Sequence, residues 1–384
     1  MPAIDLSDIA VVDNHCHAVE TRQDADQARW RAFFSESPDP AMRTEAAAHT
    51  AFYRRLLRAM AAFHQVPATE DDVLAARAAY RADELVGRLF ADAGIGGVVI
   101  DTGFPAPEAA MPTGMFDEAS RADRVALLRL EVLFGRLVAE HENYADLVEA
   151  VRSATSDLRA AGYAGFKSIA GYRTGLAIER WEDDAARAAF GAARAEVDSV
   201  GSVRLGHKPL LDTLLHLAFA AAAEQELPVQ FHVGYGDPDA DLRKAAPLEL
   251  RDVLEEPAYR SMPVVLLHGC WPYFREGAYL AAVYGNVHLD LSYGIPFLSL
   301  GEMRSMTRAA LAVAPFTKLM YSSDGARVPE LNWMGAHDGR RVLGEVLGEL
   351  VADADLDDGE ARRAGELVLR DNACTLYGLE GLRR

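Results

Sequence analysis

Two histidines near the start of the chain stand one residue apart, in the stretch VVDNHCHAVE at residues 11–20. Successive side chains of a β-strand point to opposite faces, so His15 and His17 would project to one side of a strand and Cys16 to the other. Two neighbouring imidazoles can bind one divalent metal ion. A strand end with two hydrogen-bonded histidines gives the same short pattern, so the rest of the chain must distinguish the two interpretations.

Four more polar residues that could belong to a metal or substrate site end apolar runs elsewhere: Lys167, His232, His268 and Asp324. Imidazole nitrogens and a carboxylate oxygen suit zinc, or manganese as a second choice, and a catalytic site leaves a coordination position for water or substrate. A lysine ammonium is a poor ligand. A Lys167 carbamylated by carbon dioxide would instead present two anionic oxygens to one or two ions, and an unmodified Lys167 would contact the substrate.

Eight short apolar runs alternate with helical patterns and must position these side chains. The runs are residues 9–13, 96–104, 125–131, 164–172, 227–237, 262–270, 286–293 and 317–325. Buried parallel strands read as nearly continuous apolar runs, and helices between them imply βα units. Eight such units predict an α/β fold, the (β/α)₈ TIM barrel. A doubly wound open sheet is the alternative, but no GxGxxG motif follows a strand to open a helix.

The barrel prediction gives the polar residues a common place. Active-site residues of TIM barrels lie at the carboxyl ends of the strands. One histidine or one aspartate at a strand end is usually structural. Six such residues at the same end of a regular array indicate a metal site, so we expect His15, His17, Lys167, His232, His268 and Asp324 to gather there.

Residues 21–90 differ from the rest of the chain, because their apolar positions recur at helical spacing. We expect a helical insertion here, after a first barrel strand in residues 1–20, with residues 91–384 completing a single TIM-barrel domain. The insertion would follow the first strand on the catalytic face. It is therefore a candidate lid or dimer interface, with Trp30 and Phe33 buried against the pocket or a neighbouring subunit.

The composition restricts the partners. The 384 residues carry a formal net charge of −19, with 50% hydrophobic residues. This charge disfavours nucleic acids and anionic membrane surfaces, and a small-molecule substrate fits better. No signal peptide or apolar segment of membrane-spanning length is recognisable, and the three cysteines are far apart, as in a reducing compartment. We expect a cytoplasmic enzyme that forms a homo-oligomer.

The order HxH, Lys, His, His, Asp resembles the amidohydrolase superfamily of metal-dependent hydrolases, and within it the amidohydrolase-related family 2. The stretches GFKSIAGYRTGL, HKPLLDTLLH, LPVQFHVGYGD and SSDGARVPELNW, and the long run from VVLLHGC to DLSY, are similar to the amidohydrolase domain fused to glutamine synthetase in some fungal and plant proteins. The resemblance extends from about residue 9 to DNACTLYGL. One position departs from the expected pattern, since Ser292 stands where an acidic residue is expected.

This resemblance implies a (β/α)₈ fold with metal ligands at His15, His17, His232 and Asp324. It implies that Lys167 and His268 contribute to the metal or substrate site. For such relatives it implies hydrolysis of γ-glutamyl or similar amides, although the departure at Ser292 leaves the substrate open.

The chemistry follows from the cation. A divalent ion lowers the pKa of bound water toward about 7 and polarises a carbonyl, so metal-bound hydroxide would attack an amide carbon. Asp324 would pass a proton from the attacking water to the leaving amine, and His268 would donate to the oxyanion or complete the metal site. The alternative is a metal-dependent, non-oxidative decarboxylase of a small aromatic or unsaturated acid. Lys167 argues against it, and a catalytically silent metal-binding protein is the third interpretation.

Several residues just after the strands are candidates for substrate binding. Arg173, beside Tyr172, is a better candidate to hold a substrate carboxylate through two parallel hydrogen bonds than Arg129, which with Glu131 would share one strand face or form an ion pair that braces the rim. The aromatic and acidic residues that follow other strands would line the pocket or cover it: Tyr235, Trp271, Glu330 and Trp333.

Overall fold

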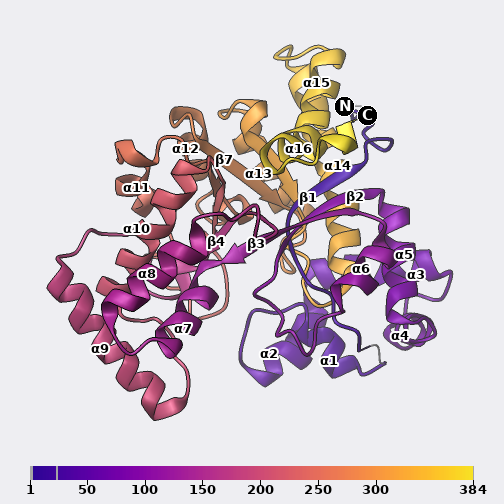
Figure 1. Cartoon of the computed structure of the whole chain (residues 1–384). Coiled ribbons are helices and arrows are strands. Elements are labelled where there is room, and N and C mark those ends of the chain that lie inside the picture. Colours follow the sequence, from indigo (N-terminus) through magenta and orange to yellow (C-terminus); the bar gives the residue numbers. More distant parts are fainter. Residues whose placement is uncertain (1–2, 23–24, 384) are drawn as a thin grey trace. The chain divides into compact units, whose positions relative to one another are not determined.

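The computed structural model describes residues 3–22 and 25–383. Eight strands form one sheet in chain order, β1 to β8, and the strand pairs with a recorded register run parallel (Figure 1). The fold is the predicted α/β (β/α)₈ TIM barrel. The strands are β1 (Val11–His17), β2 (Ile95–Asp101), β3 (Asp123–Arg129), β4 (Tyr163–Ser168), β5 (Val229–Phe231), β6 (Val264–Leu266), β7 (Val287–Ser292) and β8 (Leu319–Ser322).

Helices separate the strands along the chain. They are α1 (Gln27–Ala32), α2 (Pro40–Thr44), α3 (Ala51–His64), α4 (Glu70–Ala78), α5 (Ala82–Ala93), α6 (Thr113–Ser120), α7 (Leu130–Glu140), α8 (Tyr144–Thr155), α9 (Asp183–Val200), α10 (Lys208–Glu224), α11 (Arg251–Glu255), α12 (Phe274–Val283), α13 (Leu300–Leu311), α14 (Pro329–Ala352), α15 (Asp358–Glu366) and α16 (Asn372–Tyr377). Helices α1 to α5 lie between β1 and β2, and an insertion with the bounds 21–90 stays a prediction. A lid or dimer role for this segment stays a prediction.

The helices form two compact units together with the strands. The first comprises the described parts of Met1–Arg124, Asp290–Ala312 and Leu319–Arg384, and the second comprises Val125–Leu289 and Val313–Lys318. Within the first unit β1 lies beside β2 and β8. Within the second, β3 to β6 pair in register and continue into the start of β7.

The long helices of the first unit form where their apolar residues face the core. In α5 the buried residues are Leu85, Val86, Leu89 and Phe90, and this face packs against α14 and α6 (Figure 1). The helix ends at Gly94, whose φ of 59° is left-handed and suits a residue without a Cβ. The next residue starts β2, so this turn connects helix and strand with minimal length.

The strand boundaries correct two sequence predictions. The first strand runs to His17 rather than ending at residue 13, so both histidines of the HxH motif lie within it. The third strand ends at Arg129, and Glu131 lies in the first turn of α7. The expectation that Arg129 and Glu131 share a strand face is therefore wrong. Leu130 to Glu140 has apolar residues at helical spacing, and this pattern starts the helix earlier than expected.

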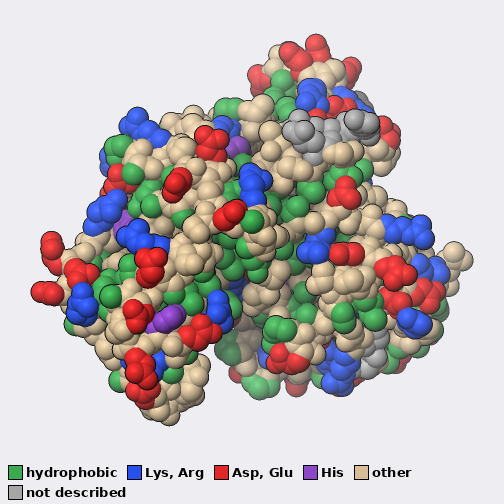
Figure 2. All heavy atoms as spheres, in the orientation of Figure 1, with side chains coloured by type: hydrophobic (Ala, Val, Ile, Leu, Met, Phe, Trp, Pro, Cys, Tyr) green, Lys and Arg blue, Asp and Glu red, His purple; other side chains and the backbone are tan. Residues whose placement is uncertain are grey.

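The surface carries charges of both signs. In the space-filling view, acidic and basic side chains alternate with apolar ones over the face turned to the reader (Figure 2). None of the helices in the described ranges is long and apolar enough to cross a membrane.

Candidate metal centre

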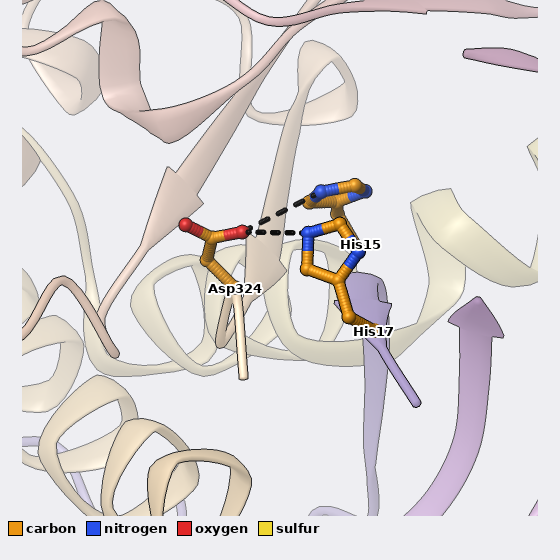
Figure 3. A group of neighbouring side chains, drawn as sticks. All are labelled: His15, His17 and Asp324. Carbon is orange, nitrogen blue, oxygen red and sulfur yellow. Dashed lines mark ion pairs between the residues drawn. The ribbon is translucent and has the colours of Figure 1, made fainter. Parts of the chain in front are cut away.

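His15 and His17 point to the same side of β1, as the strand alternation predicts. Their ring centroids lie 4.8 Å apart, with the planes at 83° to each other. The Nε2 atoms of both rings lie 3.5 Å from Oδ1 of Asp324 (Figure 3). The His15 side chain is fully buried, and those of His17 and Asp324 are exposed by only 11% and 15%. Three potential ligand atoms therefore converge in a mostly dry environment.

Asp324 reaches this position through the backbone after β8. Its N–H donates to the carbonyl of His15 at 3.0 Å, and the N–H of His17 donates to the carbonyl of Gly325 at 2.8 Å. Asp324 has a φ of +54°, which residues with a Cβ adopt rarely. The reciprocal hydrogen bonds hold this conformation, and they link the aspartate to the same strand that carries the two histidines.

A buried hydrogen-bond network lies beneath the aspartate. Asp13 is fully buried, and its carboxylate accepts hydrogen bonds from the Ser323 N–H at 2.8 Å, the Ser323 hydroxyl at 2.5 Å and the Asn332 amide at 3.3 Å. The Ser323 hydroxyl also accepts from the N–H of Gly325 at 2.8 Å. Burial raises the pKa of Asp13 to about 7 despite these donors. The network fixes both neighbours of Asp324 in the chain.

His17 has an additional acidic neighbour at the end of β2. Oδ2 of Asp101 lies 3.9 Å from Nδ1 of His17, and the Asp101 side chain is buried. A carboxylate beside the remote nitrogen of a metal-binding histidine fixes the tautomer and leaves the other nitrogen free to bind the ion. The ring of Phe104 meets the His17 ring edge to face at 5.4 Å. The Phe104 contact restricts the His17 ring, and Asp101 places a negative charge near its Nδ1 without a hydrogen bond.

The donor set fits a divalent cation. One ligand atom from each of His15, His17 and Asp324 lies within 4.8 Å of the other two. Two imidazole nitrogens and one carboxylate oxygen are the ligands of catalytic zinc sites that keep an open position. The pairwise separation of 3.5 Å is close to that of two ligands bound at about 2.1 Å in tetrahedral geometry. This part of the predicted metal site is therefore assembled within the first unit.

The other three predicted ligands belong to the second unit. Lys167 lies on β4 with 1% of its surface exposed, His232 follows β5, and His268 begins the turn after β6. Nδ1 of His232 lies 2.9 Å from Nε2 of His268, and Nε2 of His232 lies 2.5 Å from the carbonyl of Tyr235. His232 and His268 thus come together as predicted. Their role as metal ligands, and that of Lys167, stays a prediction.

The aromatic candidates for substrate binding in the second unit surround this pair. The rings of Tyr172 and His232 are 4.4 Å apart, and that of Tyr235 lies 5.1 Å from His268. The Trp271 carbonyl accepts a hydrogen bond from the N–H of Tyr235. These contacts place Tyr172 and Tyr235 against the histidines.

The charged candidates of this unit have structural partners as well. Glu131 is buried and accepts a hydrogen bond from Ser168 at 2.8 Å, and burial raises the pKa of its carboxyl. Desolvation lowers the pKa of the Arg173 guanidinium, which donates to the carbonyl of Tyr172. Arg129 is the last residue of β3. A substrate role for these residues stays a prediction.

Two candidates in the first unit take part in buried contacts. Glu330 is fully buried and forms an ion pair with Arg77 at 2.5 Å. The indole N–H of Trp333 donates to Asp92 at 2.7 Å, and its ring contacts Phe63. These interactions give both residues a structural role, and a pocket-lining role stays a prediction.

The residues that support the centre were not predicted from the sequence. Asp13, Asp101, Ser323 and Asn332 act only through tertiary contacts, and none has a spacing that identifies it. The single available signal was an acidic residue two positions before His15 on the same strand face.

Known proteins are similar to this chain in sequence and in fold. A family model described as Amidohydrolase matches residues 117–379, a range that includes Asp324 but neither histidine of β1. The chain is 36% identical over 222 residues to protein fluG of Emericella nidulans, covering 56% of this chain and 25% of that protein. The chain thus spans about a quarter of the length of this curated relative.

Solved structures are similar over the whole chain. A protein from Lactobacillus casei that is assigned as a metal-dependent hydrolase is 27% identical, with a TM-score of 0.89 and 100% of both chains covered. A uronate isomerase from Bacillus halodurans is 13% identical, with a TM-score of 0.66, and the match covers 98% of this chain and 96% of that one. At such low identity the second likeness concerns the fold alone.

Proposed function

Since this chain belongs to the amidohydrolase family of metal-dependent hydrolases, we propose that it cleaves an amide C–N bond in a small molecule with a γ-glutamyl or N-acyl amino group. The observation that carries the proposal is the convergence of His15, His17 and Asp324, with both Nε2 atoms 3.5 Å from one carboxylate oxygen. The substrate class is the one that the resemblance of the sequence motifs implies, whereas the match to fluG covers 25% of that protein and names no substrate.

His15, His17 and Asp324 would hold the cation, zinc or manganese. When bound, a divalent cation lowers the pKa of a coordinated water and polarises a carbonyl. The Asp101 carboxylate lies 3.9 Å from Nδ1 of His17, and a negative charge on this side would favour the tautomer that leaves Nε2 available as a ligand. The buried network of Asp13 and Ser323 keeps the carboxylate of Asp324 in place.

Asp324 has a second task in this proposal. One of its carboxylate oxygens faces the two histidines, and the other would take a proton from the attacking water and deliver it to the leaving amine. The amine is a poor leaving group without this proton. The side chain is 15% exposed, which gives water access while burial strengthens its electrostatic interactions.

We assign the second unit a supporting part in the same proposal. His232, His268 and Lys167 remain candidates for further ligands, with Lys167 as a carbamate or as a substrate contact. Tyr172 and Tyr235 pack on the two histidines and would shape the substrate side. Each assignment predicts a separate result: His232→Ala should bind less metal per chain, and a carbon dioxide dependence of metal binding in the parent should be absent from Lys167→Ala.

The test is a turnover screen with metal-reconstituted protein. Zinc and manganese forms are incubated with γ-glutamyl and N-acyl amino compounds, and released amine is measured. The expected result is amine release that chelation abolishes and metal restores. Metal-dependent release of carbon dioxide from hydroxybenzoates, without amine release from any amide, would replace the proposal by the decarboxylase alternative.

An Asp324→Asn variant provides the control for mechanism. It keeps the size of the side chain, and an amide cannot serve as the base. We expect kcat to fall by about a hundredfold to ten-thousandfold, with a smaller change in KM. An Asn variant that retains the metal and turns over at the parent rate would exclude the proposed proton transfer by Asp324.

A further inference from the structure

An arginine stands three residues beyond Asp324, on the same segment that follows β8. The N–H of Arg327 donates to the carbonyl of Ala18 at 3.0 Å, and the N–H of Glu20 donates to the carbonyl of Arg327 at 2.7 Å. The chain after His17 and the chain after Asp324 therefore continue side by side beyond the metal centre. Arg327 lies on this continuation.

The side chain of Arg327 is joined to the centre through one aromatic ring. Its guanidinium carbon lies 4.8 Å from the centroid of the Phe104 ring, and the same ring meets the His17 ring edge to face at 5.4 Å. The guanidinium is thus two ring contacts from a proposed metal ligand. Stacking on an aromatic face restricts the guanidinium without using its hydrogen-bond donors.

Glu20 holds one corner of the guanidinium. Nη1 of Arg327 donates to Oε1 of Glu20 at 2.8 Å, and the other oxygen of Glu20 accepts from Arg29 at 2.5 Å. The carboxylate is 7% exposed and is shared between two guanidinium groups. One shared carboxylate cannot fully compensate the charge of Arg327.

The other edge of Arg327 faces solvent. Its side chain is 41% exposed, and Nε and Nη2 have no hydrogen-bond partner among residues 3–22 and 25–383. These two nitrogens form the fork that binds a carboxylate through two parallel hydrogen bonds. In a chain with a formal net charge of −19, a held and exposed guanidinium beside the centre is a favourable place for an anion.

We propose that Arg327 is a specificity residue that binds a carboxylate on the acyl part of the substrate while the scissile amide lies at His15, His17 and Asp324. The substrate class is then an amide of a dicarboxylic acid, in which the free carboxylate meets the Nε and Nη2 edge of Arg327. Phe104 and Glu20 are positioning residues for this arginine. The inference rests on the proposed function, because it takes the metal centre as the place where the amide reacts.

The test measures binding, so it does not depend on turnover. Glutarate and butyrate differ by one carboxylate, and their affinities for the zinc-loaded protein are measured by isothermal titration calorimetry. In the parent protein glutarate should bind more tightly than butyrate. In Arg327→Met this preference should fall by about tenfold to a hundredfold, since a charge-assisted bidentate pair is lost. Succinate and adipate, measured in parallel, give the reach between the centre and the arginine.

Two variants serve as controls. Arg327→Lys keeps the charge and loses the fork, so its preference for glutarate should lie between those of the parent and Arg327→Met. Arg81→Met removes an exposed arginine that is paired with Asp83, and the preference should be that of the parent. Thermal unfolding shows whether each variant is folded. If Arg327→Met is not folded, the glutarate preference of Arg327→Lys alone decides whether Arg327 binds the carboxylate.

The outcomes separate the inference from the proposed function. Equal glutarate preference in the parent, Arg327→Lys and Arg327→Met, or no preference in the parent, overturns the role of Arg327 even where amides are hydrolysed. A preference that depends on Arg327 supports it even where the amide screen finds no turnover, and the fault then lies in the proposed reaction.

Discussion

Two regions with paired histidines differ in what the imidazole nitrogens face. After β5 and β6, Nδ1 of His232 meets Nε2 of His268, and Nε2 of His232 meets a backbone carbonyl. On β1, the Nε2 atoms of His15 and His17 both face the carboxylate of Asp324. A neutral imidazole has one lone pair on nitrogen. In His232 that lone pair serves His268 when its other nitrogen donates to the carbonyl.

This difference indicates that the β1 pair is the one preorganised for a cation. Two neutral imidazoles whose nitrogens face a carboxylate do not repel a cation. A cation placed among the three groups would be attracted to the carboxylate and to the nitrogen lone pairs. Both nitrogens of His232 are engaged, so its ring must turn before it can become a ligand. The β1 pair should therefore determine cation binding at this centre, and a change at His232 should affect it less.

The largest effect should come from removing one ligand of the β1 cluster. We expect His17→Ala to lose the bound metal on dialysis, and amide hydrolysis should fall at least about a hundredfold. His232→Ala should retain metal to a greater extent under the same dialysis. Metal content by atomic emission and amine release, measured on both variants, provide the check.

The opposite order of metal loss in the two variants would contradict this comparison. A His17→Ala protein that holds metal as firmly as the parent, beside a His232→Ala protein that loses it, would show that the β5–β6 pair dominates binding. Equal loss in both variants would show that no pair is preorganised.

A second large effect concerns the fold rather than the ions. Arg77→Met should lower the free energy of unfolding by about 3–5 kcal/mol, because the fully buried Glu330 loses its ion-pair partner. The double variant Arg77→Met/Glu330→Met should recover part of this loss. Chemical denaturation of all three proteins measures it. A Glu330→Met variant with normal stability and greatly raised KM would instead assign Glu330 to substrate binding.

Ser323→Ala sharpens the comparison by loosening only one member of the β1 cluster. It removes the hydroxyl that donates to Asp13 and accepts from the N–H of Gly325. Ser323 and Gly325 are the two chain neighbours of Asp324. We expect the free energy of unfolding to fall by about 1–3 kcal/mol, and kcat to fall by about tenfold. Ser305→Ala, in an exposed helical position, is the matched control. Unchanged kcat with reduced stability would limit the network to a structural role.

A further effect is expected in the unit of the second pair, and it depends on pH. Burial, followed by the charge of Lys318, lowers the pKa of His288 from 6.5 to about 4. The unfolded state then binds more protons than the folded state between these values, so stability rises with pH from about 4 to 6.5 and is lost as pH falls through that range. The contribution is at most about 3 kcal/mol. His288→Gln should flatten this slope in denaturation curves, and an unchanged slope would exclude His288 as its source.

The sequence predicted what is local and periodic. Apolar runs located all eight strands, and alternation along a strand placed His15 and His17 on one face. The boundary at Arg129 was wrong, because a helix pattern and a strand pattern overlap where α7 begins. A run of only five residues fits a helix pattern and a strand pattern equally well, so it cannot distinguish the two.

The support of the centre could not be predicted in the same way. Asp13 and Ser323 are 310 positions apart in the chain, and their contact depends on the register of β1 against the segment after β8. Arg327 likewise becomes recognisable only when its ring contact with Phe104 is known. Such pairs have no common period, and single-sequence patterns contain no information on them.

The hydrogen bonds between the segment of His15 and His17 and that of Asp324 and Gly325 also have a consequence during synthesis. A ribosome makes the aspartate roughly three hundred residues after the histidines, so a nascent chain has two of the three ligands long before the third exists. Metal taken up by the emerging polypeptide would be held by two imidazoles only. Firm loading must wait until Asp324 and Gly325 have left the ribosome and have formed their hydrogen bonds with the strand of His15 and His17.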